Sequence, residues 1–221
     1  MVFLHGYLSS KEAFAAQIRY FSRFYRVTAI DFIGFGGSVP LKQAFSVDDY
    51  AAWTREVFRL LKVKSPHVIA HSFGCRVAVK LAAAQPDFFD KMLLTGAAGV
   101  ILKRGFSYHC KVKAYRLVRR IAPTYAEKHF GSAEYRTLSQ IMKESYKKIV
   151  NEDLRAFANE ITNEVLLIQG KGDTVTPMAA ANVYLNAFPN ARLVEMQGGH
   201  FAFAEHPLAF NLIVEEFLDD G

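Results

Sequence analysis

The sequence of 221 residues is poor in cysteine and contains no long apolar run. Its two cysteines, Cys75 and Cys110, are too few for a disulfide framework or a four-thiolate zinc site, and they favour a reduced, cytoplasmic setting. No stretch approaches the roughly 18 apolar residues that a membrane-spanning helix needs, so we expect no integral membrane association. The first ten residues have no basic segment before an apolar one, which argues against a secretory signal.

Metal, nucleotide and nucleic-acid signatures are also lacking. The seven histidines include no pair at metal-ligand spacing, and the glycines at 34–37 do not form a Gly-x-Gly-x-x-Gly loop, so we expect neither a metal nor a cofactor. The net charge of +6 is concentrated in residues 103–160, which hold 13 Lys and Arg but 6 Asp and Glu. A nucleic-acid partner would need a basic stripe on the main fold, so we expect none. This basic segment fits an anionic substrate, an anionic membrane surface or, as we favour, a solvated helical face.

What the sequence does contain is a repeated strand-and-helix pattern. With 51% hydrophobic and 22% charged residues, it suits one globular domain with a buried core. Serines at 9 and 46, each followed by an acidic residue three positions later, predict capping boxes that open two helices. Strands alternating with helices predict an α/β fold with a mostly parallel sheet, covered by helices on both faces. The predicted strands are 2–4, 26–31, 67–71, 92–95, 165–168 and 192–196, with further helices at 75–84, 178–187 and 205–218.

Residues 102–160 interrupt this pattern. They show helical periodicity at 115–121 and 135–149 but no strand. We therefore expect a helical cap inserted into a core made of residues 1–101 and 161–221.

Three polar residues follow predicted strands and carry the chemistry. Ser72 lies in Ala70-His71-Ser72-Phe73-Gly74, where a strand meets a helix and small residues flank a tight turn, as a nucleophile elbow requires. Asp173 and His200 follow two later strands. A serine hydroxyl needs a base, and the base needs an orienting acid. The order Ser, Asp, His along the chain predicts that the three meet at the carboxyl edge of the sheet.

Taken together, these motifs resemble the α/β-hydrolase superfamily, in particular its small serine hydrolases with a helical cap. The resemblance rests on the segments 4–7, 31–38, 70–74, 170–177 and 199–207. It implies that Ser72 is the nucleophile, His200 the general base and Asp173 its acid, with the backbone N–H groups of Tyr7 and Phe73 as the oxyanion hole. Asp31 and Ser38 match positions that shape a turn.

The sequence departs from this family at three places. Ala70 and Cys75 replace glycines that many relatives have around the elbow. Relatives usually have two strands before the one at residues 2–4. We expect either that this member lacks these amino-terminal strands or that its true start lies upstream of Met1, and without them the strand at 26–31 becomes an exposed edge.

The predicted function is a serine hydrolase that cleaves an ester of a small molecule, apolar or anionic, through an acyl-enzyme. Phe35, Phe201 and Phe203 are predicted to line an apolar mouth and contact substrate, whereas His5 and His71 are predicted to be structural. Two alternatives stay open: a carbon–carbon bond hydrolase of the same fold, and a hydrolase-like protein that binds a ligand without turnover. The sequence does not specify the natural substrate, the cap's conformation or the oligomeric state.

Overall fold

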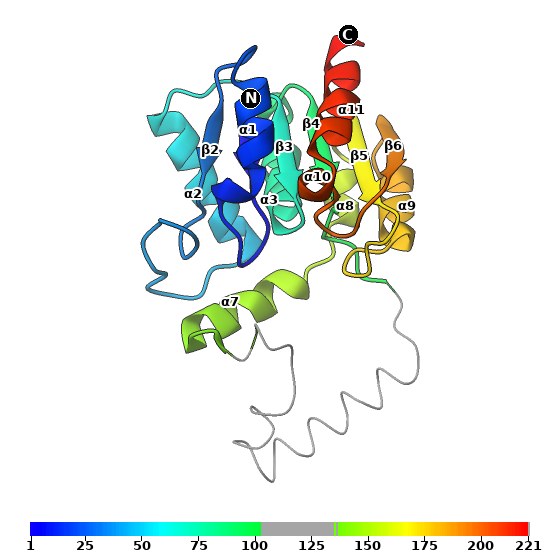
Figure 1. The fold of residues 1–221 in the computed structure, drawn as a ribbon. Coiled ribbons are helices and arrows are strands. Elements are labelled where there is room, and N and C mark those ends of the chain that lie inside the picture. Colours follow the sequence, from blue (N-terminus) through cyan, green and yellow to red (C-terminus); the bar gives the residue numbers. More distant parts are fainter. Residues whose placement is uncertain (103–134, 136, 221) are drawn as a thin grey trace.

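The computed structural model describes residues 1–102, 135 and 137–220, and its centre is a six-stranded sheet (Figure 1). The strand order is β2-β1-β3-β4-β5-β6, and every neighbouring pair is parallel. This confirms the predicted parallel sheet of an α/β-hydrolase fold. The strands are β1 (Val2–Leu4), β2 (Thr28–Ile30), β3 (Val68–His71), β4 (Met92–Thr95), β5 (Val165–Gly170) and β6 (Ala191–Met196).

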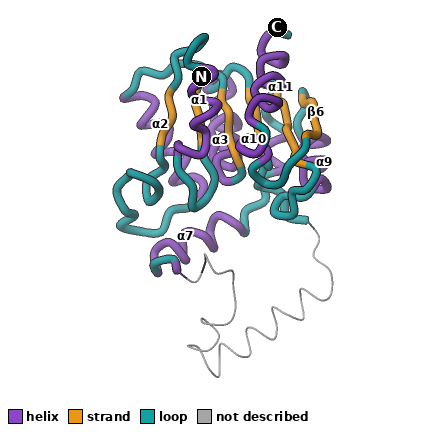
Figure 2. Tube along the Cα trace, in the orientation of Figure 1, coloured by secondary structure: helices purple, strands orange, loops and turns teal. Residues whose placement is uncertain are grey.

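Helices cover both faces of this sheet (Figures 1 and 2). Successive strand residues point to opposite faces, so Val2 and Leu4 pack into one core while Phe3 packs into the other. The first core is closed by α2 (Val47–Leu60), α3 (Phe73–Ala84), α8 (Arg155–Ala158) and α9 (Met178–Ala187), and the second by α1 (Ala15–Phe21), α10 (Ala202–Glu205) and α11 (Pro207–Asp219). None of the described helices combines the length and the apolar character that crossing a bilayer would require.

The two predicted capping boxes have different outcomes. The one that opens α2 is confirmed: Ser46 Oγ accepts from the Asp49 amide at 3.2 Å, and Asp49 Oδ2 accepts from the Ser46 amide at 2.7 Å. The one at Ser9 is wrong, because the chain enters a 3₁₀ turn at Lys11–Phe14 without a side-chain cap. The Lys11 amide donates instead to Asp31 Oδ1 at 2.7 Å, so a carboxylate distant in the sequence replaces the local serine.

Asp31 also holds the glycine-rich turn that follows β2. Its Oδ2 accepts from the Gly37 amide at 2.9 Å and from Lys11 Nζ at 2.7 Å, and Ser38 Oγ donates to its backbone oxygen at 2.6 Å. Burial by itself would raise the pKa of Asp31, but the bonds from Lys11 and Gly37 outweigh it and lower the pKa. The carboxylate therefore joins this turn to the 3₁₀ turn at Lys11–Phe14, which precedes α1.

The described part of the predicted insertion is α7 (Gln140–Val150) together with α8. In Figure 1, α7 lies beyond one end of the sheet, and the side chains of Tyr146 and Ile149 line a pocket at the carboxyl ends of the strands. Ser145 Oγ donates to the Phe45 carbonyl at 2.7 Å, and Tyr7 donates to the Met142 carbonyl at 3.1 Å, so α7 is tied to the core. The predicted helix at 115–121, Cys110 and most of the basic segment lie outside the described residues.

Candidate active site

The sheet places the predicted catalytic residues at one edge. β2 and β3 lie on opposite sides of β1. The connection from β1 to β2 therefore runs toward one edge of the sheet, and the connection from β3 to β4 runs toward the other. Open α/β sheets bind ligands in the crevice that such a reversal creates at the carboxyl ends of the strands. Ser72 directly follows β3, whereas Asp173 and His200 follow β5 and β6 after short loops.

The elbow at Ser72 is a strained turn. Ser72 has φ 49° and ψ −107°, a left-handed backbone that a residue with a Cβ rarely adopts and that costs about 1–3 kcal/mol. A Cβ added at Gly74 would collide with the backbone oxygen of Leu4, so the turn needs glycine there. Ser72 is also the N-cap of α3, and the amino end of a helix favours negative charge nearby. The strained backbone at Ser72 thus raises the serine hydroxyl above the sheet.

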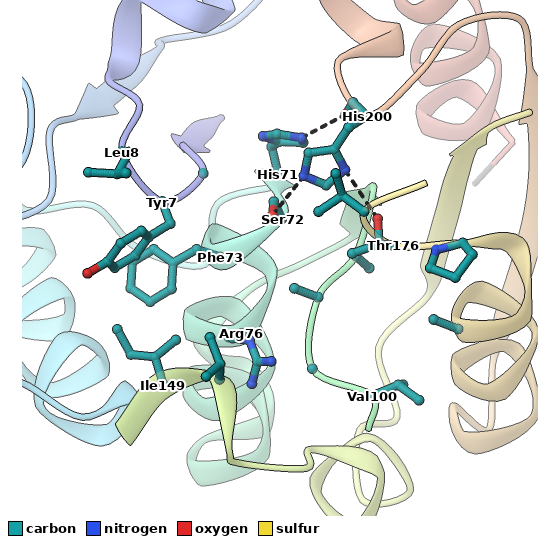
Figure 3. Close-up of a pocket in the computed structure, with 18 of the residues that line it drawn as sticks. Tyr7, Leu8, His71, Ser72, Phe73, Arg76, Val100, Ile149, Thr176 and His200 are labelled. Carbon is teal, nitrogen blue, oxygen red and sulfur yellow. Dashed lines mark hydrogen bonds between the residues drawn. The ribbon is translucent and has the colours of Figure 1, made fainter. Parts of the chain in front are cut away.

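The three residues form a continuous hydrogen-bonded chain (Figure 3). Ser72 Oγ lies 3.0 Å from His200 Nε2, and Asp173 Oδ2 lies 2.8 Å from His200 Nδ1. An ionised carboxylate can only accept, so Nδ1 carries the hydrogen and Nε2 is free to accept the serine proton. This is the arrangement that general-base activation of a hydroxyl requires.

Asp173 is held by donors on several sides. Its Oδ1 accepts from the amides of Val175 at 2.8 Å and Thr176 at 2.9 Å, while Oδ2 accepts from Thr176 Oγ1 at 2.7 Å and Gln169 Nε2 at 3.2 Å. Burial by itself would raise the pKa of Asp173, but the bonds from His200 and Thr176 outweigh it and hold the pKa well below its usual range. The carboxylate is therefore ionised at neutral pH and ready to stabilise a protonated imidazole.

Two further side chains hold the loop that carries His200. His71 Nε2 donates to the His200 carbonyl at 2.9 Å, and Glu205 Oε2 accepts from the Gly199 amide at 2.8 Å. Burial and the neighbouring His200 lower the pKa of His71 to about 3, so His71 stays neutral beside the ring of His200. Its side chain supports the loop and makes no bond to the Ser72 hydroxyl.

A pocket of about 640 Å³ opens next to Ser72. The backbone amides of Tyr7 and Phe73 belong to residues that line it, and neither amide has a hydrogen-bond partner within the described ranges. Tyr7 follows β1 and Phe73 begins α3, and Figure 3 shows the two residues side by side next to Ser72. Two free donors beside a nucleophile are what a developing oxyanion needs.

The three predicted aromatic contacts have different positions. Phe201 lines the pocket and its side chain is 43% exposed. Phe35 and Phe203, in contrast, are buried in the two cores and do not line it, which corrects the prediction for both. Phe203 points into the layer between the sheet and α11, because α10 turns successive side chains to different faces.

The remaining histidine and cysteine candidates near the site are structural. His5 Nε2 accepts from the Phe32 amide at 3.0 Å, and His5 Nδ1 lies 2.7 Å from the Gly6 carbonyl. Cys75 is buried, donates to the Ala70 carbonyl at 3.2 Å, and has its thiol pKa raised by burial. In residues 1–102, 135 and 137–220, no three His, Cys, Asp or Glu side chains gather as a metal site would require.

Comparison with known proteins identifies the family. Residues 1–130 match the family model described as "alpha/beta hydrolase fold", and residues 143–221 match one described as "TAP-like protein". The chain belongs to the α/β-hydrolase superfamily. This α/β-hydrolase is 28% identical to the 2-hydroxymuconate semialdehyde hydrolase of Pseudomonas putida, over 89% of the chain and 78% of that protein.

Solved structures of the superfamily have the same fold. The esterase from Exiguobacterium antarcticum superimposes with a TM-score of 0.79 at 21% identity, covering 99% of this chain and 91% of the esterase. The enol-lactonase from Burkholderia xenovorans gives a TM-score of 0.77 at 24% identity, covering 99% and 90%. At these identities the likeness supports the fold of this α/β-hydrolase and leaves its substrate open.

Several supporting residues could not be found from the sequence motifs. Gln169 and Thr176 bond to Asp173, and Glu205 bonds to the loop of His200. Thr176 lies within the 170–177 motif, so the sequence placed it near Asp173. That its hydroxyl donates to Asp173 depends on side-chain geometry, which the motif does not give. Arg76, one helical turn after Ser72, also lines the pocket.

Proposed function

We propose that this α/β-hydrolase is a serine hydrolase that cleaves an ester through an acyl-enzyme. The observation that carries the proposal is the bonded chain from Ser72 Oγ to His200 at 3.0 Å and from His200 to Asp173 at 2.8 Å. A carbonyl compound suits the site because Tyr7 and Phe73, whose amides have no partner among the described residues, line the same pocket as Ser72.

The reaction follows from these groups. Ser72 Oγ attacks the substrate carbonyl carbon while its proton moves to His200 Nε2, and Asp173 stabilises the imidazolium. The amides of Tyr7 and Phe73 donate to the oxyanion, and each such donor contributes about 3–4 kcal/mol to the transition state. His200 then gives its proton to the leaving alkoxide oxygen as the C–O bond breaks. A water molecule, deprotonated by His200, attacks the acyl-enzyme and releases the acid.

We also infer that residues 102–160 act as a cap over a core of residues 1–101 and 161–221. The support comes from α7, whose Tyr146 and Ile149 line the same pocket as Ser72. In this arrangement the core supplies the reacting groups and the cap supplies part of the substrate-binding wall.

Replacement of the nucleophile tests the esterase proposal. Ser72→Ala is expected to abolish hydrolysis of 4-nitrophenyl acetate while the protein stays folded, and Ser22→Ala, at an exposed serine outside the pocket, is expected to keep the parental rate. Circular dichroism spectra of both variants establish that they are folded. Turnover retained in Ser72→Ala would eliminate the mechanism.

A second candidate is cleavage of a carbon–carbon bond. It is favoured by the similarity to the 2-hydroxymuconate semialdehyde hydrolase, whose name gives a semialdehyde and not an ester as the compound hydrolysed. A panel of esters of increasing chain length, assayed beside vinylogous diketones, separates the two candidates. Higher kcat/KM for the esters supports the first, and higher kcat/KM for the diketones supports the second.

A further inference from the structure

The pocket contains one unusual charge. Among the described residues that line it, Arg76 is the only one with a permanent charge, and its side chain is 7% exposed. Arg76 lies on α3, four residues after Ser72, which places its backbone about 6 Å farther along the helix axis. The guanidinium bonds to Glu152, just beyond α7, so it lies on the side where α7 closes the pocket (Figure 3).

Arg76 has no carboxylate partner in the described part of the chain. Its Nη1 donates to the Glu152 carbonyl at 2.8 Å, and this is its one hydrogen bond there. The charges of Glu152 and Asp153 act on Arg76 from a distance, but both carboxylates form their ion pairs with other cations: Glu152 with Lys80 at 2.5 Å, and Asp153 with Arg155 at 2.9 Å. Buried cations are normally paired, because leaving one without a counter-charge is costly.

Most of the donors of this guanidinium are unused. A guanidinium has five N–H groups, so one bond to a carbonyl leaves four. Arg76 lines the pocket, and its Nε and Nη2 are not among the fully buried atoms that lack a partner, so neither is completely enclosed by protein. The apolar residues Ile149 and Val100 line the same pocket, and Figure 3 draws the Arg76 side chain in the region between them.

We propose that Arg76 binds a carboxylate of the substrate, so that the preferred ester is a monoester of a dicarboxylic acid. The inference rests on the proposed function and specifies its substrate class. The planar guanidinium fork matches both oxygens of a carboxylate, and a water-poor site strengthens that contact. Apolar residues that line the same pocket, such as Val100, Ile149 and Val150, suit the methylene chain that joins the carboxylate to the scissile carbonyl.

A structural role is the competing account of Arg76. Glu152 lies just beyond the carboxyl end of α7, where carbonyl oxygens attract a cation. Arg76 would then only tie α7 to the core. That account uses one of the five donors, and it predicts no preference between a charged and a neutral ligand.

Binding to a variant without a nucleophile decides between the two accounts. In the Ser72→Ala background, isothermal titration calorimetry compares monomethyl glutarate with dimethyl glutarate, which differ in the free carboxylate. We expect the monoester to bind at least tenfold more tightly. Adding Arg76→Gln is expected to bring the two Kd values within about twofold, whereas adding Arg59→Gln, at an exposed arginine on α2, leaves the ratio unchanged. Equal binding in the background, or a ratio that survives Arg76→Gln, would overturn the proposal.

Two features keep the test decisive. If Arg76→Gln does not fold, as judged by circular dichroism, Arg76→Lys replaces it: loss of the fork geometry is expected to lower the ratio at least threefold, and an unchanged ratio counts against the proposal. Because no turnover occurs in this background, the binding ratio does not depend on the catalytic mechanism. Failure of the esterase proposal is seen separately, as absence of hydrolysis of both monomethyl and dimethyl glutarate by the unmodified protein.

Discussion

Asp173→Asn removes the charge that faces His200 and changes little else. The asparagine oxygen can still accept the amides of Val175 and Thr176, which lie 2.8 and 2.9 Å from Oδ1, so the loop keeps its shape. The other side-chain atom, 2.8 Å from His200 Nδ1, becomes an NH₂ group that can only donate. His200 then carries its hydrogen on Nε2, where the Ser72 proton must be received.

The expected cost is large for catalysis and small for folding. In serine triads this change lowers kcat by about 10⁴-fold, which corresponds to about 5 kcal/mol of transition-state stabilisation. The free energy of unfolding should fall by about 1–3 kcal/mol, because the hydrogen bonds to Oδ2 lose their charged acceptor. Catalysis and stability are therefore expected to separate clearly.

The assay measures kcat and kcat/KM for 4-nitrophenyl acetate and the urea midpoint on the same preparations. Asp87→Asn, at an exposed aspartate outside the pocket, is the matched control, and both of its values are expected to stay near those of the parent. A loss of less than tenfold in kcat for a folded Asp173→Asn protein would refute the assignment of Asp173 as the orienting acid.

Three further predictions concern stability. Phe203→Ala empties a fully buried site and should lower the unfolding free energy in urea by about 3–5 kcal/mol. Phe24 is 60% exposed, so Phe24→Ala should change this free energy by less than about 0.5 kcal/mol. Equal effects of the two substitutions would contradict the packing described. Gly74→Ala should lower Tm far more than Gly37→Ala. A Cβ at Gly74 would strike the backbone of β1, whereas a Cβ at Gly37 would make an ordinary van der Waals contact. Similar Tm values for the two variants would count against the elbow geometry. The pKa of Asp173 lies below its ordinary value of 3.8, so its carboxylate stabilises the fold above about pH 4, and that stability is lost as the pH falls through the folded-state pKa. Urea unfolding near pH 6 and pH 3 should show a steeper loss of unfolding free energy for the parent than for Asp173→Asn. Parallel losses in the two proteins would be inconsistent with a lowered pKa of Asp173.

The sheet could be predicted from the sequence because its strands are buried on both faces. Runs such as 92–95 and 165–168 are continuously apolar and end at turn residues, which fixes where each strand ends. The elbow could also be predicted from the sequence, because crowding at Gly74 requires small residues near Ser72. The order of Ser72, Asp173 and His200 then placed all three at one edge.

Side-chain direction and contacts between distant segments could not be read in this way. The Ser9 capping box failed because Asp31, twenty residues beyond Lys11, supplies the cap. Phe203 follows His200 by three residues, yet a short helical turn directs it into the core and away from the pocket. Arg76 has no ion-pair partner among the described residues because Glu152 and other carboxylates from later segments bind elsewhere, and no local sequence pattern encodes this.

Covalent labelling tests the central claim most directly. A fluorophosphonate reacts with a serine only when a base activates it and amides hold the developing oxyanion, so it reports on the assembled site without a known substrate. We predict that mass spectrometry of the intact protein and its peptides finds one adduct, on Ser72, and that His200→Gln loses it while remaining folded. An unlabelled Ser72, or labelling at the same rate in His200→Gln, would contradict the account.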